Sequence, residues 1–115
     1  MSDKIRAALG FAAKAGKIAS GEFAVNKAVV SRKAYLIVVD SQASERTKKR
    51  WKDASAFYDV KYVEFDDASI ITGRRAKVVF AITGKEFSDM ILNELNIVTN
   101  DNASHTQNTK HGGVY

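Results

Sequence analysis

The sequence predicts an α/β protein, a three-layer α/β/α sandwich around a mixed sheet of about four strands. Two observations lead to this prediction. The runs 35–39 and 78–82 are continuously apolar and rich in β-branched residues, which is typical of strands buried on both faces. Segments with apolar residues at helical spacing alternate with these runs, and such alternation favours a sheet covered by its connecting helices.

The first half of the chain contains three predicted helices and two predicted strands. Apolar residues at helical spacing predict a helix over residues 3–15, and Gly16 is placed to end it. A short strand over residues 17–19 follows. Ser20 can cap a second helix that runs to about Arg32, with Phe23 as a core or staple residue in its first turns. The remaining two are a buried strand over 34–40 and a helix that Ser44 caps and that ends near Tyr58.

The second half supplies two more strands and a last helix. The predicted elements are a strand over 61–65, a loop or single helical turn over 66–72 that ends at Gly73, a strand over 77–83 and a helix over 84–95. Residues 96–115 are rich in Asn, Thr and Gly and hold few large apolar residues. We therefore expect one domain over residues 1–95 and a polar, flexible tail over residues 96–115.

Several classes of chemistry have no residues to support them. The chain has no Cys, which excludes a disulfide, a thiolate nucleophile and a cysteine-ligated zinc site. Its two His residues, His105 and His111, lie in the predicted tail, so a His-centred catalytic triad in the domain is excluded. Neither a dinucleotide-binding glycine motif nor a P-loop occurs. We expect a protein that is not an enzyme and that needs no cofactor and no metal.

The longest apolar runs are far shorter than the roughly 20 residues that cross a bilayer, and the first residues do not resemble a secretory signal. We therefore expect no membrane association, a cytoplasmic location and a monomer.

Positive charge is concentrated in the first half of the chain. Residues 1–52 hold twelve Lys/Arg and four Asp/Glu, a net charge of +8, whereas residues 53–95 hold five and eight, a net charge of −3. The densest cluster is Lys48, Lys49 and Arg50, with Lys52 beside them. Such a run is typical of a solvated helix face, but it also suits a surface that meets nucleic-acid phosphates.

Several motifs together resemble the YlxQ-type bacterial proteins of the L-seven-Ae / L-thirty-e ribosomal protein family, which binds kink-turn RNA. The resemblance is carried by residues 9–22 (LGFAAKAGKIASGE), 27–34 (KAVVSRKA) and 43–49 (ASERTKK), and by Gly73, the strand over 78–83 and the helix that contains Phe87. It covers roughly residues 4 to 95. The combination of AGK, SGE, a Lys six residues after that Gly, and SERTKK is more specific than any one of these pieces.

The resemblance implies a non-catalytic protein whose partner is structured RNA, with the ribosome as a further candidate partner. In that family the start of the second helix and the loop before the last strand hold the RNA. The corresponding candidates here are Lys17, Ser20, Gly21, Glu22, Phe23, Asn26, Lys27, Ile70, Ile71, Thr72, Gly73, Arg74 and Arg75. One pair departs from the pattern, because archaeal and eukaryotic members carry Asn-Glu where this chain has Phe23-Ala24.

Physical chemistry suits these positions to RNA. A helix N-terminus offers unpaired N–H groups and positive dipole charge to a phosphate. Gly21 lets the backbone approach a ligand closely, and Lys27 can add a point charge or contact a guanine edge. An apolar loop such as Ile70-Ile71 can pack against an unstacked base.

Two other interpretations remain open from the sequence. Asp40 ends a predicted strand, and Asp66-Asp67 follow another, which also fits a small doubly wound signalling domain with a phosphoacceptor site. Alternatively, the chain is a ribosome-associated adaptor that contacts other proteins.

Overall fold

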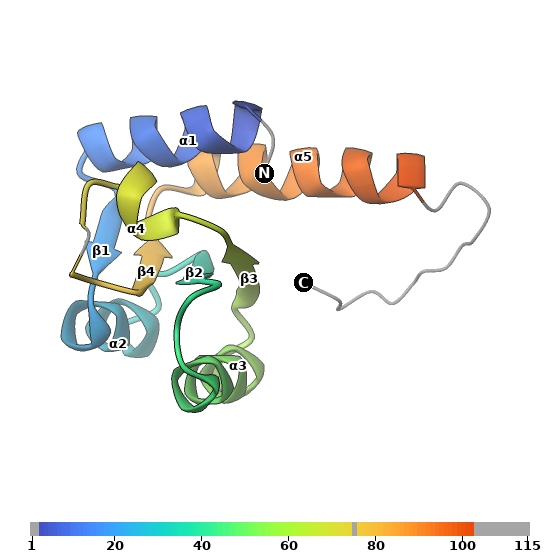
Figure 1. The fold of residues 1–115 in the computed structure, drawn as a ribbon. Coiled ribbons are helices and arrows are strands. Elements are labelled where there is room, and N and C mark those ends of the chain that lie inside the picture. The colour runs from blue at the N-terminus through green and yellow to red at the C-terminus, as the bar shows by residue number, and fades with distance from the viewer. Residues whose placement is uncertain (1–2, 75, 103–115) are drawn as a thin grey trace.

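A four-stranded mixed sheet forms the middle layer of the structure (Figure 1). The computed structural model describes residues 3–74 and 76–102. The strand order is β1-β4-β2-β3, where β4 pairs antiparallel with both β1 and β2, and β2 pairs parallel with β3. The strands are β1 (Ile18–Ser20), β2 (Leu36–Asp40), β3 (Lys61–Phe65) and β4 (Val79–Ile82). The predicted mixed sheet is confirmed.

Helices cover both faces of this sheet (Figure 1). One face carries α1 (Asp3–Lys14), α4 (Ala68–Ile71) and α5 (Lys85–Asn102), and the other carries α2 (Glu22–Val30) and α3 (Glu45–Tyr58). The predicted three-layer sandwich is therefore confirmed as well.

Alternation of side chains along β2 builds the two cores. Leu36 and Val38 pack with residues of α1, α4 and α5, while Ile37 and Val39 pack with residues of α2 and α3. Each fully buried aliphatic side chain of this size contributes about 1.5–3 kcal/mol. Both faces of the strand are thus apolar, which explains the unbroken apolar run in the sequence.

Local signals end or begin two helices as the sequence predicts. Gly16 adopts φ 72° after α1, and the Lys17 N–H donates to the Ala12 carbonyl at 2.8 Å. The Ser44 side chain accepts a hydrogen bond of 3.1 Å from the Thr47 N–H at the start of α3.

The last helix is longer than the sequence analysis predicts. It ends at Asn102 rather than near Leu95. The physical reason lies in the composition of residues 96–102, because Asn, Thr and Asp are weak helix formers but no Pro or Gly is present to stop the helix. Residues 103–115 of the predicted tail lie outside the described residues, so its flexibility and the domain boundary stay predictions.

A buried carboxylate ties α4 to the sheet. Asp40, 2% exposed at the end of β2, accepts hydrogen bonds from the Ser69 N–H at 3.0 Å and the Ser69 hydroxyl at 2.8 Å. It also accepts one from the Gln42 N–H at 2.9 Å. Asp40 therefore caps a short helix to which the neighbouring Asp67 gives no side-chain hydrogen bond.

These bonds also set the charge state of Asp40. Burial by itself would raise the pKa of this carboxyl, but the bonds from Ser69 and Gln42, with the charge of Lys48, bring its pKa below the ordinary value of 3.8. The lowered pKa means that the folded state favours the carboxylate more than the unfolded state does. The resulting stabilisation is fully present above the unfolded pKa and is lost as the pH falls through the folded one.

We predict that Asp40→Ala lowers the free energy of unfolding by about 1–3 kcal/mol at neutral pH, because the Ser69 donors lose their acceptor. Urea denaturation measures the difference, which should shrink below about pH 4 as the wild-type carboxylate is protonated. Asp53→Ala is the control, since Asp53 pairs with the exposed Lys49 on the surface of α3, and it should change stability by no more than about 0.5 kcal/mol. A pH-independent difference would contradict the role given to the Asp40 charge.

Candidate nucleic-acid interface

The second helix begins at a glycine without a side-chain cap. Gly21 is the N-cap of α2 with φ 89° and ψ 162°, and its N–H donates to the Val79 carbonyl of β4 at 2.9 Å. The prediction that Ser20 caps this helix is wrong. Ser20 pairs with Phe80 in the β1–β4 ladder, so its backbone belongs to the strand and the helix starts one residue later.

This start leaves the first turn of α2 open. Gly21 has no side chain to accept from the first N–H groups, and no other described residue supplies a side-chain cap. Glu22 is the acidic residue of this turn and is exposed. The first N–H groups of α2 therefore have no side-chain acceptor at the positive end of the helix dipole, and Gly21 itself is buried.

A lysine of the loop before β4 lies directly on this glycine. A Cβ added at Gly21 would lie 3.1 Å from Lys77 Cδ and 3.4 Å from Lys77 Nζ. The loop that leads into β4 and the start of α2 are thus side by side, and a cation lies at their junction. Lys77 is not among the candidate residues that the sequence motifs indicate. In the sequence Lys77 is recognisable only as a charged residue just before a buried strand. Its place beside Gly21 follows from the pairing of β4 with β1, which the sequence does not reveal.

Backbone hydrogen bonds shape the rest of that loop. The Arg74 N–H donates to the Ser69 carbonyl, and the Lys77 N–H donates to the Arg74 carbonyl, each at 2.9 Å. Gly73, at φ 75°, provides the turn between α4 and Arg74. Arg74 is exposed, and Arg75 lies outside the described residues.

The apolar residues of α4 divide between core and surface. Ile70 is 53% exposed, whereas Ile71 is half-buried against the core. Only Ile70 therefore offers its side chain to a ligand at the surface. Thr72 is buried and donates its hydroxyl to the Ala68 carbonyl at 2.9 Å, so its side chain holds the turn together.

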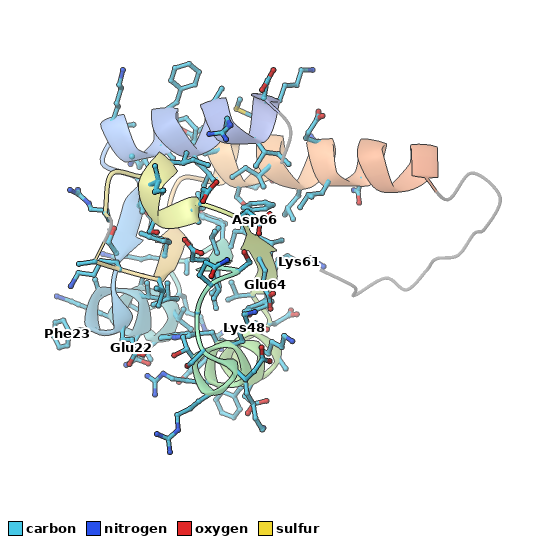
Figure 2. The ribbon with its side chains drawn as sticks, viewed as in Figure 1. Glu22, Phe23, Lys48, Lys61, Glu64 and Asp66 are labelled. Carbon is cyan, nitrogen blue, oxygen red and sulfur yellow. The ribbon has the colours of Figure 1, made fainter. Side chains whose placement is uncertain are left out.

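The outer side of α2 presents an aromatic ring and a cation. Phe23 is 86% exposed and, with Glu22, lies on the outer side of the helix (Figure 2). The expectation that Phe23 packs in the core is wrong, because the inward stripe of α2 is made by Val25, Ala28 and Val29. Asn26 and Lys27 are also exposed on this helix.

Lys17 lies away from this junction. It precedes β1, whereas Gly21 follows it, and its Cβ would lie 3.1 Å from a Cβ added at Gly84, next to the start of α5. The structure places Lys77 against Gly21 at the start of α2, and α4 leads along the chain into the loop that carries Lys77. We call this area the α2–loop surface, and its members are Gly21, Phe23, Lys27, Ile70, Arg74 and Lys77.

The basic cluster of α3 is partly neutralised within the chain. Lys48, whose side chain is 14% exposed, lies 3.6 Å from both Glu45 and Glu64, and Lys52 lies 3.8 Å from Glu64 (Figure 2). Lys49 pairs with Asp53 at 2.9 Å. By contrast, no carboxylate of the described residues forms an ion pair with Lys27, Arg74 or Lys77. Positive charge on the α2–loop surface is thus available to a ligand, although its basic residues are less closely spaced in the sequence than those of α3.

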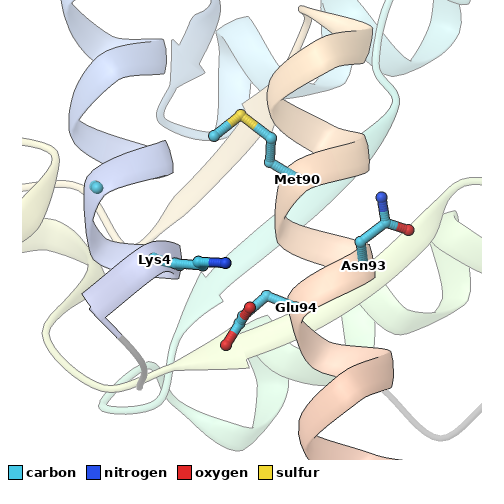
Figure 3. A pocket seen from close by; sticks show the side chains of 5 residues that line it. Lys4, Met90, Asn93 and Glu94 are labelled. Atoms are coloured by element: carbon cyan, nitrogen blue, oxygen red, sulfur yellow. The ribbon is translucent and has the colours of Figure 1, made fainter.

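A groove of about 330 Å³ between α1 and α5 has a different character (Figure 3). It is lined by Lys4, Ala7, Met90, Asn93 and Glu94. One cation and one carboxylate balance its charge, so it does not attract a polyanion.

The acidic residues do not form the site that a phosphoacceptor domain needs. Asp40 is buried and its oxygens accept three hydrogen bonds, while Asp66 accepts a hydrogen bond from the Ser41 hydroxyl. Within residues 3–74 and 76–102, no group of three His, Cys, Asp or Glu side chains is placed to hold a metal ion. Nor does any helix in these ranges have the length and apolar character to cross a membrane.

The fold and this surface define a class of small α/β/α proteins, and comparisons identify the family within it. No family model matches the chain. It is 31% identical over 90 residues to the RNA-binding protein YlxQ of Bacillus subtilis (strain 168), covering 76% of this chain and 90% of that protein. It is 37% identical over 83 residues to the RNA-binding protein YlxQ of Enterococcus faecium, covering 70% and 80%. The chain therefore belongs to the YlxQ family, as its motifs indicate.

Solved structures share the fold of this chain. A protein of unknown function from Bacillus halodurans C superposes with a TM-score of 0.76 at 26% identity, covering 83% of this chain and 99% of the other. The 15.5kD RNA binding protein of Giardia lamblia superposes with a TM-score of 0.67 at 16% identity, covering 83% and 87%. The second likeness concerns the fold alone.

We predict that Gly21→Ala disturbs the surface more than Gly73→Ala does. Both glycines have positive φ, so each substitution should cost about 1 kcal/mol or more in unfolding free energy. Only at Gly21 does the new Cβ meet Lys77, because nothing lies within 4 Å of a Cβ at Gly73. NMR chemical shifts of the Lys77 side chain should change in Gly21→Ala and stay in place in Gly73→Ala. Unchanged Lys77 signals in both variants would contradict this contact.

Proposed function

We propose that this chain binds structured RNA through the α2–loop surface, without catalysis. The observation that carries the proposal is the position of Lys77 on Gly21, which places an unpaired cation beside the uncapped start of a helix. The relatives named RNA-binding protein YlxQ support RNA as the ligand class.

Each part of the surface has a distinct role in this proposal. A backbone phosphate binds the first N–H groups of α2, with Lys77 and Arg74 adding charge-assisted contacts. Ile70 packs against a base that has left the stack, since its side chain is exposed at the end of α4. Asp40 acts indirectly, because it holds α4 and therefore the loop in place.

We further propose that the preferred RNA is sharply bent or kink-turn-like and that it belongs to the ribosome or to another cytoplasmic RNA. The turn at Gly21 and the loop residue Lys77 meet in the structure, and such a junction suits two backbones that approach across a bend. The second residue after Gly21 is a phenylalanine, so the amide and carboxylate that could hydrogen-bond base edges at positions 23 and 24 are absent. Affinity then depends on phosphates and shape more than on base identity.

We predict that Lys77→Ala weakens binding to a kink-turn duplex and reduces the slope of log affinity against log salt by about 1, because one phosphate contact is lost. Fluorescence anisotropy across a salt series measures both quantities. Lys27→Ala should act in the same direction. Lys49→Ala is the matched control, since Lys49 is an exposed lysine paired with Asp53 on α3, and it should leave affinity and slope unchanged.

Two further outcomes decide between the alternatives. If the wild-type chain shows no saturable binding to a kink-turn duplex or to a matched straight duplex at low salt, the proposed function is wrong. Co-sedimentation with ribosomes that survives both high salt and RNase would instead support a protein-contacting adaptor.

A further inference from the structure

A groove of about 380 Å³ runs along the outer side of α2. Its lining residues, which define the α2 groove, are Phe23, Ala24, Lys27, Ala28, Ser31, Lys33 and Thr83. Phe23, Lys27 and Ser31 are spaced four residues apart, so they form one stripe that is about 12 Å long. The small side chains of Ala24 and Ala28 lie beside this stripe and leave room for a flat ligand.

The aromatic ring that lines the groove is highly exposed. Phe23 is 86% exposed, although α2 itself is anchored by Val25, Ala28 and Val29 in the core. The ring is therefore held on a rigid element and has only two side-chain torsions to restrict when a ligand covers it. A ring so placed is available for stacking, and nucleobases stack on exposed aromatic side chains regardless of base identity.

The charge of the groove selects an anion. Lys27 and Lys33 line it, and none of its seven lining residues carries a carboxylate. Lys27 lies one helical turn after Phe23, about 6 Å along the axis, so a base on the ring and a phosphate on the ammonium fit one nucleotide. Glu22 is the nearest acid in sequence, but it does not line the groove.

Continuity with the α2–loop surface indicates which anion this is. Phe23 is two residues from Gly21, and both belong to the first turn of α2. An RNA held at the helix start can continue along the same helix past Glu22, the acidic residue of this turn, which does not line the groove. We propose that the α2 groove holds an unpaired nucleotide of the bound RNA, with its base stacked on Phe23 and its phosphates on Lys27 and Lys33. This inference rests on the proposed function.

The test compares ring-removing and ring-keeping variants on two RNAs, a kink-turn duplex with unpaired loop nucleotides and a fully paired duplex of equal length. Phe23→Leu should weaken binding of the kink-turn RNA about fivefold or more, because base–aromatic stacking is lost. Phe23→Tyr should keep wild-type affinity, because it keeps a ring. Phe57→Leu is the matched control, since Phe57 on α3 is also highly exposed, at 79%, and lies outside the groove; it should have no effect.

Two readouts separate stacking from electrostatics. Phe23→Leu should lower affinity without changing the salt slope, whereas Lys33→Ala should reduce the slope by about 1. Affinity for the fully paired duplex should be the same in wild type and Phe23→Leu, because that RNA offers no free base. Melting temperatures confirm that each variant is folded, which is expected for an exposed position.

The failure of this inference differs from the failure of the proposed function. If Phe23→Leu binds the kink-turn RNA as tightly as wild type while Lys77→Ala still weakens binding, the α2 groove does not hold a nucleotide although RNA binding stands. An equal loss on both RNAs would also overturn it, because stacking on a free base requires an unpaired nucleotide. If the wild-type chain binds neither RNA, the proposed function itself is wrong.

Discussion

The insertion of β4 between β1 and β2 is the constraint on which the rest of this structure depends. The register of β1 and β4 sets Ser20 opposite Phe80, and the next residue, Gly21, donates its N–H to Val79. The chain segment before β4 must then pass the start of α2, which is how Lys77 comes to lie on Gly21. A ladder inside the sheet therefore determines the geometry of a surface outside it.

The buried interior keeps this arrangement rigid. β2 and β4 are apolar on both faces, so helices must cover both sides of the sheet. A shift or rotation of α2 on its side of the sheet would expose Val25 and Val29 to solvent. On the opposite face, Asp40 joins the end of β2 to the start of α4 through hydrogen bonds that the rest of the loop depends on. The helix α2 and the short helix α4, which lead to the two sides of the proposed RNA surface, are thus both attached to the same sheet.

The ion pairs of the described residues distinguish the two basic surfaces of this structure. The densest run of lysines and arginines lies on α3, yet Lys48 and Lys52 contact Glu64, and Lys49 contacts Asp53. The pairs with Glu64 link α3 to β3, and the Lys49–Asp53 pair lies within α3. All of them reduce the attraction of α3 for a polyanion. The cations near α2 are fewer, but they have no such partners among the described residues, and phosphate binding responds to charge that is free.

The sequence alone determined the layers of the molecule, because layering follows from local patterns. Unbroken apolar runs predicted the buried strands, helical spacing predicted the helices that cover them, and Gly16 and Ser44 marked helix boundaries through backbone chemistry within a few residues. Its motifs also determined the family. The predicted end of α5 was wrong, because a segment of weak helix formers without Pro or Gly does not mark where the helix ends.

Only the tertiary structure decided which residues share a surface. Ser20 is a strand residue and not a cap, the side chain of Phe23 is exposed, and Lys77 lies against Gly21. The places of Ser20 and Lys77 depend on the pairing of β1 with a strand sixty positions later along the chain, as Ser20 with Phe80 shows. Local periodicity carries no information about such a partner, because strand pairing is settled by burial and hydrogen bonding over the whole sheet.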